Sequence, residues 1–163
     1  MNKSRKGFTL VEVTLVVLII SILVVVGVPQ YKKSMETSWA ATAAGIAFMV
    51  ANANRRFNLE NPGLYASGDL TACPATPGVC VKGATSACNL ISCGYITNFP
   101  FSKMPYNYLA INPNTGSNRQ LSRAVRSDSA RYPCPTTALY YSWGYLCYTD
   151  GSCQAQGSAP RPP

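Results

Sequence analysis

The side chains that most enzymes use for acid–base chemistry are scarce in this chain. It has no histidine, so a site that needs an imidazole base, such as Ser-His-Asp or Cys-His, is excluded. Six carboxylates are scattered over the 163 residues: Glu12, Glu36, Glu60, Asp69, Asp128 and Asp150. A paired-carboxylate site needs two close carboxyl groups with separated pKa values. The sequence therefore predicts no catalytic residues, no enzyme and no cofactor.

Cysteine is the second reactive residue type. All seven cysteines lie in the C-terminal two thirds of the chain, at Cys73, Cys80, Cys88, Cys93, Cys134, Cys147 and Cys153. No CxxC occurs and the spacing is irregular, so a four-cysteine zinc site is a weak alternative and no metal is predicted. Disulfides in an oxidising compartment fit better. The odd number leaves at least one thiol unpaired or paired between molecules.

The N-terminal region has the length and composition of a membrane-spanning segment. Residues 8–28 are apolar except for one charge, Glu12. As a helix rising about 1.5 Å per residue, this run spans roughly 31 Å, close to the hydrocarbon thickness of a bilayer. The preceding basic residues indicate a cytoplasmic N-terminus and export of the rest; they are Lys3, Arg5 and Lys6. Lys32 and Lys33 weaken that contrast, whereas the cysteines support the same direction.

Two ordinary explanations of the apolar run are incomplete. A secretory signal peptide has about 7–15 apolar residues and a small-x-small cleavage site, which "VVVGVPQY" lacks. A simple single-pass anchor explains the length but not Glu12, since an acid in the membrane costs about 2.5–3.5 kcal/mol on insertion scales. Glu12 either complements the positive helix N-terminus or awaits a cation from another chain. These residues alone leave both alternatives open.

A basic leader ending in Gly7, then "FTLVE", an unbroken apolar run and "PQY" at residues 29–31 resemble the type IV pilin family, including type II secretion pseudopilins. The resemblance covers about a sixth of the chain. It implies that a prepilin peptidase cuts the bond between Gly7 and Phe8 and then N-methylates Phe8. It also implies that Glu12, the fifth residue of the processed chain, neutralises the terminal amine of a neighbouring subunit during assembly.

The resemblance implies a structural subunit of a type IV pilus-like extracellular filament. The implied partners are identical or homologous subunits, prepilin peptidase, the inner-membrane assembly machinery and, before assembly, the lipid bilayer. The chain would lie in the inner membrane with a cytoplasmic N-terminus and afterwards in the pilus. The alternative is a minor pilin, or a competence or type II secretion pseudopilin. Major type II pseudopilins resemble a calcium-stabilised form with acidic C-terminal ligands, and only Asp128 and Asp150 lie there, which favours a pilin proper.

The helix is expected to continue beyond the apolar run. Pro29 removes a backbone donor and Gly27 adds freedom, so a kink or local unwinding is predicted around residues 21–29. The resemblance implies loss of helix there in assembled filaments. Apolar residues then recur every three or four positions, as one stripe that should pack on a sheet from the C-terminal half: Met35, Trp39, Ala43, Ile46, Val50, Ala53 and Phe57.

The predicted class is α+β, with a long N-terminal helix, transmembrane in its first half, packed on a small antiparallel sheet with a disulfide-stabilised C-terminal region. Strands are predicted at 106–111, at 119–125 as the return strand after the turn-rich stretch "NPNTGS", and at 138–148, which is rich in aromatic residues. The expected segments are a leader (1–7), a transmembrane or filament-core helix (8–28), an amphipathic helix (29–57), a loop (58–104), a sheet with a disulfide hairpin (105–153) and a disordered tail (154–163).

Three disulfides are proposed from local spacing, although the sequence does not fix their connectivity. The turn "TDGS" between Cys147 and Cys153 predicts a bridge that pins the C-terminal hairpin, and the resemblance implies a C-terminal cystine at this place. The candidate local pairs in the loop are Cys73–Cys80 and Cys88–Cys93. Cys134 then has no clear partner.

A group of arginines is the remaining candidate site, formed by Arg119, Arg123, Arg126 and Arg131. The group is either a solvated face or a contact for DNA or another polyanion. Removing the three leader cations leaves 11 basic against 6 acidic residues, a net charge of +5. Binding to a polyanion would then fall steeply with salt. Nucleic acid is a partner that this charge permits but that no motif supports.

Overall fold

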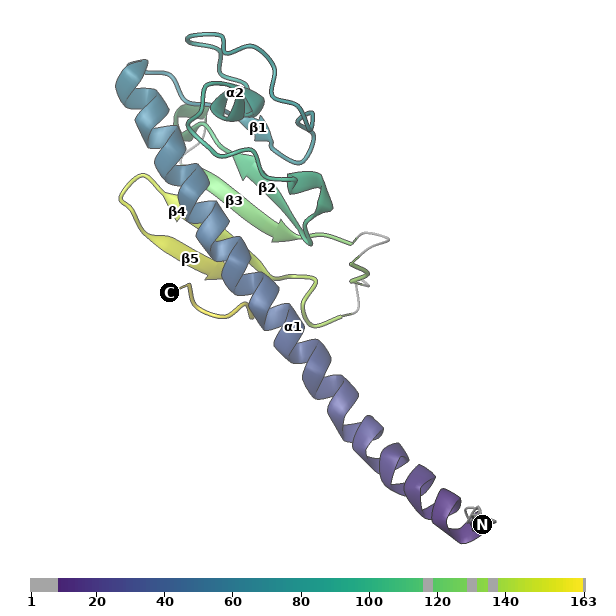
Figure 1. The fold of residues 1–163 in the computed structure, drawn as a ribbon. Coiled ribbons are helices and arrows are strands. Elements are labelled where there is room, and N and C mark those ends of the chain that lie inside the picture. Colours follow the sequence, from purple (N-terminus) through teal and green to yellow (C-terminus); the bar gives the residue numbers. More distant parts are fainter. Residues whose placement is uncertain (1–8, 116–118, 129–131, 135–137, 163) are drawn as a thin grey trace. The chain divides into compact units, whose positions relative to one another are not determined.

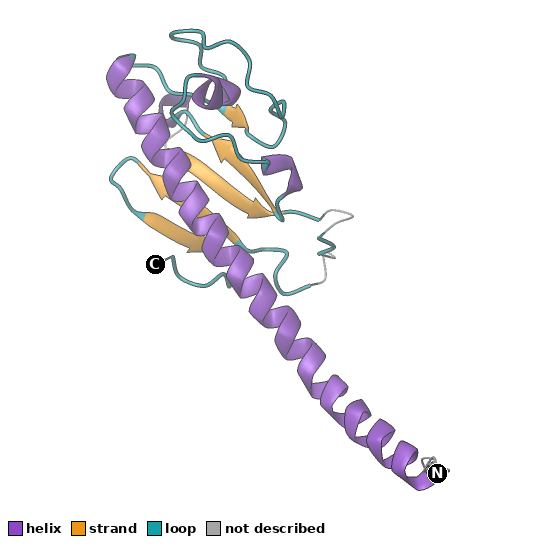
Figure 2. Ribbon diagram, viewed as in Figure 1, coloured by secondary structure: helices purple, strands orange, loops and turns teal. Residues whose placement is uncertain are grey.

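The computed structural model describes residues 9–115, 119–128, 132–134 and 138–162, and the chain divides into two compact units, 1–36 and 37–163 (Figures 1 and 2). The elements are α1 (Leu10–Glu60), β1 (Gly68–Asp69), α2 (Ala87–Ser92), η1 (Phe101–Lys103), β2 (Tyr106–Ala110), η2 (Pro113–Thr115), β3 (Gln120–Arg126), β4 (Gly144–Tyr148) and β5 (Cys153–Gln156). The predicted α+β class is confirmed, with a long N-terminal helix, a small antiparallel sheet and three disulfides.

The first unit contains the N-terminal part of α1. The hydroxyl of Thr14 donates to the carbonyl of Val11 at 3.0 Å, and the hydroxyl of Ser21 donates to the carbonyl of Val17 at 2.7 Å. In an apolar environment each polar group must be satisfied internally, and these two side chains satisfy themselves on their own helix. The apolar run, residues 10–28, can therefore face lipid or apolar protein without an unpaired hydroxyl.

In the second unit, residues 37–60 of α1 run across one face of a five-stranded antiparallel sheet (Figure 1). The strand order follows the sequence, from β1 to β5. Cross-strand partners Tyr108, Ala124 and Tyr145 are buried in the same core as the helix. The hydroxyl of Ser122 in β3 also donates to the carbonyl of Ala47 in α1 at 2.6 Å, so the helix and the sheet are joined by a hydrogen bond as well as by apolar packing.

The predicted apolar stripe lies where the period of 3.6 residues places it. Its central members are all buried in this core, namely Ala43, Ile46, Val50, Ala53 and Phe57. Trp39, one turn earlier, is partly buried and packs edge-to-face on Tyr132 with ring centroids 5.0 Å apart. Amphipathicity therefore explains why this half of α1 folds onto the sheet.

One polar side chain in the same helix joins several chain segments. Asn54 is fully buried, and its amide nitrogen lies 3.0 Å from the carbonyls of Ala66 and Ile111 and 3.2 Å from that of Leu121. Its amide oxygen accepts from the backbone N–H of Ala66 at 2.8 Å. A buried amide with these partners satisfies the carbonyls of Ala66 and Ile111 and the N–H of Ala66, and it adds a second donor to the carbonyl of Leu121. It fixes α1 to the loop that leaves it, to the end of β2 and to β3.

The long loop before β2 is ordered by a short helix and two crossed disulfides, so the pairs Cys73–Cys80 and Cys88–Cys93 are wrong. The bridges join Cys73 to Cys88 and Cys80 to Cys93, with Cα–Cα distances of 5.4 and 4.6 Å. Cys88 lies in α2 and Cys93 is its C-cap. Residues five apart on a helix are separated by roughly 7.5 Å along the axis, beyond the usual Cα–Cα reach of a disulfide. The helix therefore turns each cysteine toward the preceding loop instead.

The third predicted strand begins later than expected. Residues 138–143 form turns, in which Tyr141 donates to Ala138 and Trp143 donates to Tyr140 through backbone hydrogen bonds. The rings of Tyr140 and Trp143 pack edge-to-face with centroids 4.9 Å apart. In an extended strand residues three apart point to opposite faces, so this aromatic contact requires the turn. The predicted strand 138–148 is therefore confirmed only over β4.

The predicted disordered tail, 154–163, is also corrected over its described part. Residues 153–156 form β5, which pairs with β4, and the predicted disulfide Cys147–Cys153 joins the two strands. The tail then folds back: Trp143 donates to the hydroxyl of Ser158 at 3.1 Å and Tyr145 donates to the carbonyl of Pro160 at 3.0 Å. Buried tyrosine and tryptophan need acceptors for their polar ends. The tail supplies those acceptors.

Cys134 is buried and takes no part in the three bridges.

Candidate functional site

The apolar part of α1 is the first component of the candidate site. Every leucine, isoleucine and valine from Leu10 to Val28 is exposed, with exposed fractions from 79% at Leu10 to 45% at Val28. By length and composition this helix can cross a membrane. An apolar surface of this extent needs a cover of lipid or of other protein. The helix is therefore an interaction surface.

Glu12 lies in the first turn of this surface and is held by Thr9. The hydroxyl of Thr9 accepts from the backbone N–H of Glu12 at 3.2 Å. Both the backbone N–H and the hydroxyl of Thr9 donate to Oε2 of Glu12, each at 2.8 Å. This reciprocal arrangement is a capping box, in which two otherwise unpaired donors of the helix N-terminus are satisfied. The carboxylate also lies at the positive end of the helix dipole, which favours its charged form.

The two oxygens of Glu12 differ in their surroundings. Oε2 accepts both hydrogen bonds from Thr9, whereas Oε1 accepts none from the described residues. A cation could therefore approach Oε1 without displacing the cap. Thr9 was not among the predicted site residues, although a threonine followed three residues later by a glutamate before an apolar run is a sequence signal for this motif.

Several predicted positions remain predictions. Gly7 and Phe8, the proposed cleavage and methylation residues, lie outside the described residues. Pro29 is inside α1, and residues 21–29 are helical in this single chain. The local unwinding predicted there is therefore not seen in this chain. The kink at Gly27 and Pro29, and the loss of helix implied for the assembled filament, stay predictions.

The four arginines do not form one surface. Arg119 and Arg123 are exposed, and Arg123 lies on the sheet face opposite α1, between Leu109 and Leu146. Arg126 is buried, with 2% of its surface exposed, so its predicted contact with a polyanion is wrong. Arg131 lies outside the described residues. Strand alternation explains the difference, because Arg123 and Arg126 are an odd number of residues apart and face opposite sides.

Arg126 instead has a structural role in the core. Its guanidinium carbon lies 5.4 Å from the ring centroid of Trp39 and 5.9 Å from that of Tyr106. The same guanidinium donates through Nη1 to the carbonyls of Pro105, Ser127 and Tyr132. A buried cation is tolerated only when its donors are satisfied. Through these hydrogen bonds and ring contacts, Arg126 connects the segment after β3 with the start of β2 and with α1.

Comparison with known proteins concerns the N-terminal component alone. Residues 2–28 match the prokaryotic N-terminal methylation motif. No curated protein and no solved structure matches the chain. The matched stretch contains the basic leader, the proposed cleavage bond, the capping box of Thr9 and Glu12, and the exposed apolar helix. Motif and helix together fit anchoring in an inner membrane.

Proposed function

From the premise that residues 2–28 carry the leader signature of type IV prepilins, we propose that this chain is a structural subunit of a type IV pilus-like extracellular filament. The motif supports a type IV pilin-like or pseudopilin protein. The finer proposal depends on one observation: the apolar helix from Leu10 to Val28 is exposed and has a single carboxylate, in its first turn. The chain needs no catalysis of its own for this role.

The proposed sequence of events begins in the inner membrane, with the N-terminus in the cytoplasm. Prepilin peptidase hydrolyses the peptide bond between Gly7 and Phe8, which frees the amine of Phe8, and then methylates that amine. The inner-membrane assembly machinery next transfers the apolar helix from lipid into the filament core. A contact between different surfaces of identical subunits that does not close into a ring generates a helical fibre.

Glu12 supplies the proposed assembly contact. A charged acid in the membrane costs about 2.5–3.5 kcal/mol on insertion scales, and a buried cationic partner compensates such a cost. The terminal ammonium of Phe8 on a neighbouring subunit is that partner, and it exists only after cleavage. Oε1 of Glu12 is the atom that this ammonium meets, since Thr9 occupies Oε2.

In this proposal the folded second unit is exported with the rest of the chain. Three disulfides in this unit suit an oxidising location. A minor pilin or pseudopilin that holds DNA through the arginine group is a weaker proposal, because the buried Arg126 leaves only Arg119 and Arg123 exposed among the described residues of that group.

Intact-mass analysis of the chain from the cell envelope tests the proposal. The expected mass is that of residues 8–163 with one added methyl group and three disulfides. A Glu12→Gln variant should be cleaved and methylated but should not enter filaments seen by electron microscopy. A chain that keeps its first seven residues, or normal filaments from Glu12→Gln, would refute the proposal. The exposed Glu60→Gln is the matched control and should assemble normally.

A further inference from the structure

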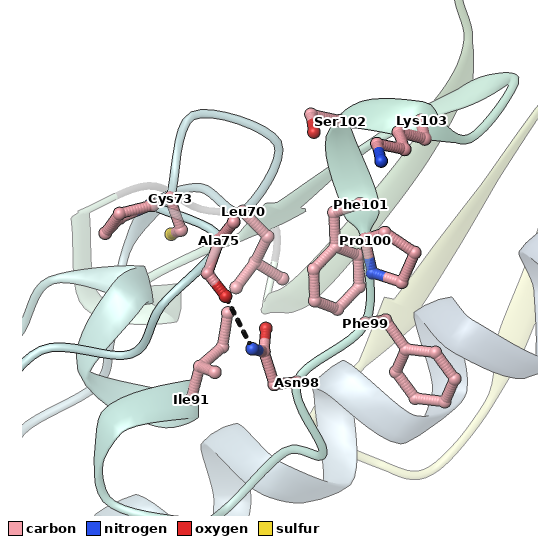
Figure 3. A pocket seen from close by; sticks show the side chains of 11 residues that line it. Leu70, Cys73, Ala75, Ile91, Asn98, Phe99, Pro100, Phe101, Ser102 and Lys103 are labelled. Atoms are coloured by element: carbon pink, nitrogen blue, oxygen red, sulfur yellow. Dashed lines mark hydrogen bonds between the residues drawn. The ribbon is translucent and has the colours of Figure 1, made fainter.

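A small pocket lies beside the first disulfide of the second unit, between the loop that follows β1 and the segment that leads to β2 (Figure 3). Its volume is about 200 Å³. The floor is formed by the buried side chains of Leu70, Ile91 and Phe101, and the more exposed Phe99 and Pro100 form one wall. Pockets for drug-sized ligands have about 300–1,000 Å³, so this pocket has room for one small unit.

Three polar groups line the same pocket and point to its ligand. The amide nitrogen of Asn98 donates to the carbonyl of Ala75 at 2.8 Å, which fixes the orientation of the amide (Figure 3). The amide oxygen of Asn98, the hydroxyl of Ser102 and the ammonium of Lys103 have no hydrogen-bond or ion-pair partner within the described part of the chain. The pocket thus offers an acceptor, a donor–acceptor and a cation beside an apolar wall.

The charge in the lining of this pocket is positive. Lys103 is the only charged residue among those that line the pocket, and no carboxylate lies in the lining to neutralise it. An anionic group is therefore attracted to this end of the pocket. The lysine is exposed, so the attraction is moderate and sensitive to salt.

Simpler occupants would use only part of this lining. An apolar side chain would cover the floor but would make no use of the amide oxygen, the hydroxyl and the ammonium, which belong to exposed residues. An inorganic anion would satisfy Lys103 but would make no use of the apolar wall. A ligand that matches every group has an apolar face, hydroxyls that both donate and accept, and one carboxylate.

We propose that this pocket binds a carboxylate-bearing monosaccharide unit, a uronic acid, of an anionic polysaccharide. The C–H face of the sugar ring contacts Phe99 and Pro100, and its carboxylate pairs with Lys103. The ring hydroxyls donate to the amide oxygen of Asn98 and exchange hydrogen bonds with Ser102. The site uses the second unit alone, so it does not depend on the proposed filament assembly.

Saturation-transfer NMR on the full-length chain in detergent micelles tests the proposal with three probes: galacturonate, galactose and inorganic phosphate. Galacturonate should bind about fivefold more tightly than galactose, as one partly exposed ion pair contributes. Phosphate should not displace galactose from the pocket. Absence of transfer to galacturonate would overturn the proposal, and phosphate competing as well as galacturonate would reduce the site to an anion contact and overturn it too.

Substitutions at exposed positions distinguish the contribution of charge to sugar binding from that of the other contacts, and they should leave the fold intact. Lys103→Gln should lower galacturonate affinity about fivefold, to the level of galactose, and leave galactose binding unchanged. Asn98→Ala should weaken both sugars. Lys82→Gln removes another exposed lysine, which does not line this pocket, and should change neither affinity. Equal losses in Lys103→Gln and Lys82→Gln would show a general charge effect and refute the assignment.

Discussion

Replacing Asn54 with alanine should destabilise the second unit more than any exposed substitution on the same helix. The amide of Asn54 is fully buried and bonds the backbone of three separate segments at Ala66, Ile111 and Leu121. Leu121 keeps a second donor, because its carbonyl also accepts from the backbone N–H of Ile111 at 2.9 Å. The substitution therefore removes the only described partner of the other two carbonyls and of the N–H of Ala66.

The magnitude follows from the number of groups left unpaired. An amide nitrogen has two hydrogens, so its three carbonyl contacts amount to two donated bonds, to which one accepted bond is added. A net hydrogen bond contributes about 1 kcal/mol, and a buried group left unsatisfied costs about 1–3 kcal/mol. The expected loss is about 3–5 kcal/mol. For a domain of this size the midpoint of thermal unfolding should fall by roughly 10–20 °C.

Near-ultraviolet circular dichroism of the full-length chain in micelles measures this loss in the second unit alone, since both tryptophans, Trp39 and Trp143, lie there. Asn52→Ala is the matched control: Asn52 is exposed two residues earlier and accepts one hydrogen bond from Arg55. Its midpoint should move by no more than about 3 °C. If Asn54→Ala and Asn52→Ala have the same midpoint of thermal unfolding, the reasoning about the buried amide of Asn54 is wrong.

A charged side chain of the same size tests the surroundings of Asn54 in a second way. Asn54→Asp keeps the size of the side chain and can still accept from Ala66, but it faces carbonyl oxygens where the amide donated. Burial beside these oxygens raises the pKa of the new carboxyl in the folded state. A raised folded pKa means that stability is gained as pH falls, so this variant should be more stable at pH 5 than at pH 7. Equal stability at both values would contradict that environment.

Three other expectations can be checked with the same chain. Thr9→Ala should raise amide hydrogen exchange in the first turn of α1, because an N-cap contributes about 1 kcal/mol; unchanged exchange would rule out the cap. Arg126→Met should lower the stability of the second unit by about 2–4 kcal/mol, whereas the exposed Arg123→Met on the same strand should be nearly neutral; equal effects would disprove the core role. The hydrogen bond from Tyr95 and then the pairing with Arg56 lower the pKa of Glu60 below 4.5, so stability is lost as pH falls through the folded value, and Glu60→Gln should show a smaller fall in melting temperature between pH 7 and pH 3; an unchanged difference would contradict the pairing.

The long elements of the fold could be predicted because their signals are repeated. The stripe through Ala43, Val50 and Phe57 samples one helix face several times, and each residue adds to the same period. The helix α2 has only six residues, Ala87–Ser92, and gives no such repetition. The pairing of Cys80 with Cys93 depends on where that helix places its cysteines. Disulfide connectivity in this loop therefore could not be deduced from spacing alone.

Two other errors have different origins. Arg123 and Arg126 are three residues apart in one strand, so strand alternation places them on opposite faces of the sheet, and one shared surface could have been ruled out. The buried packing of Ala124 and Ser122 shows which of the two faces is the core. The tail after Cys153 is polar and contains several prolines, which favours disorder by composition. Its order comes from β4 and from acceptors that Trp143 and Tyr145 require, which composition does not reveal.

The capping box also explains how one carboxylate can serve both the helix and the proposed assembly contact. The backbone N–H that Thr9 donates to Glu12 belongs to the peptide bond between residues 8 and 9. The proposed cleavage breaks the bond between Gly7 and Phe8, so it leaves that N–H in place, and the cap survives processing. The new ammonium of a neighbouring subunit can then reach Oε1 while Oε2 keeps both bonds to Thr9. The proposed ion pair would leave the first turn intact, so the proposed assembly need not reduce the stability of the helix. The position of the acid three residues after Thr9 is compatible with both roles.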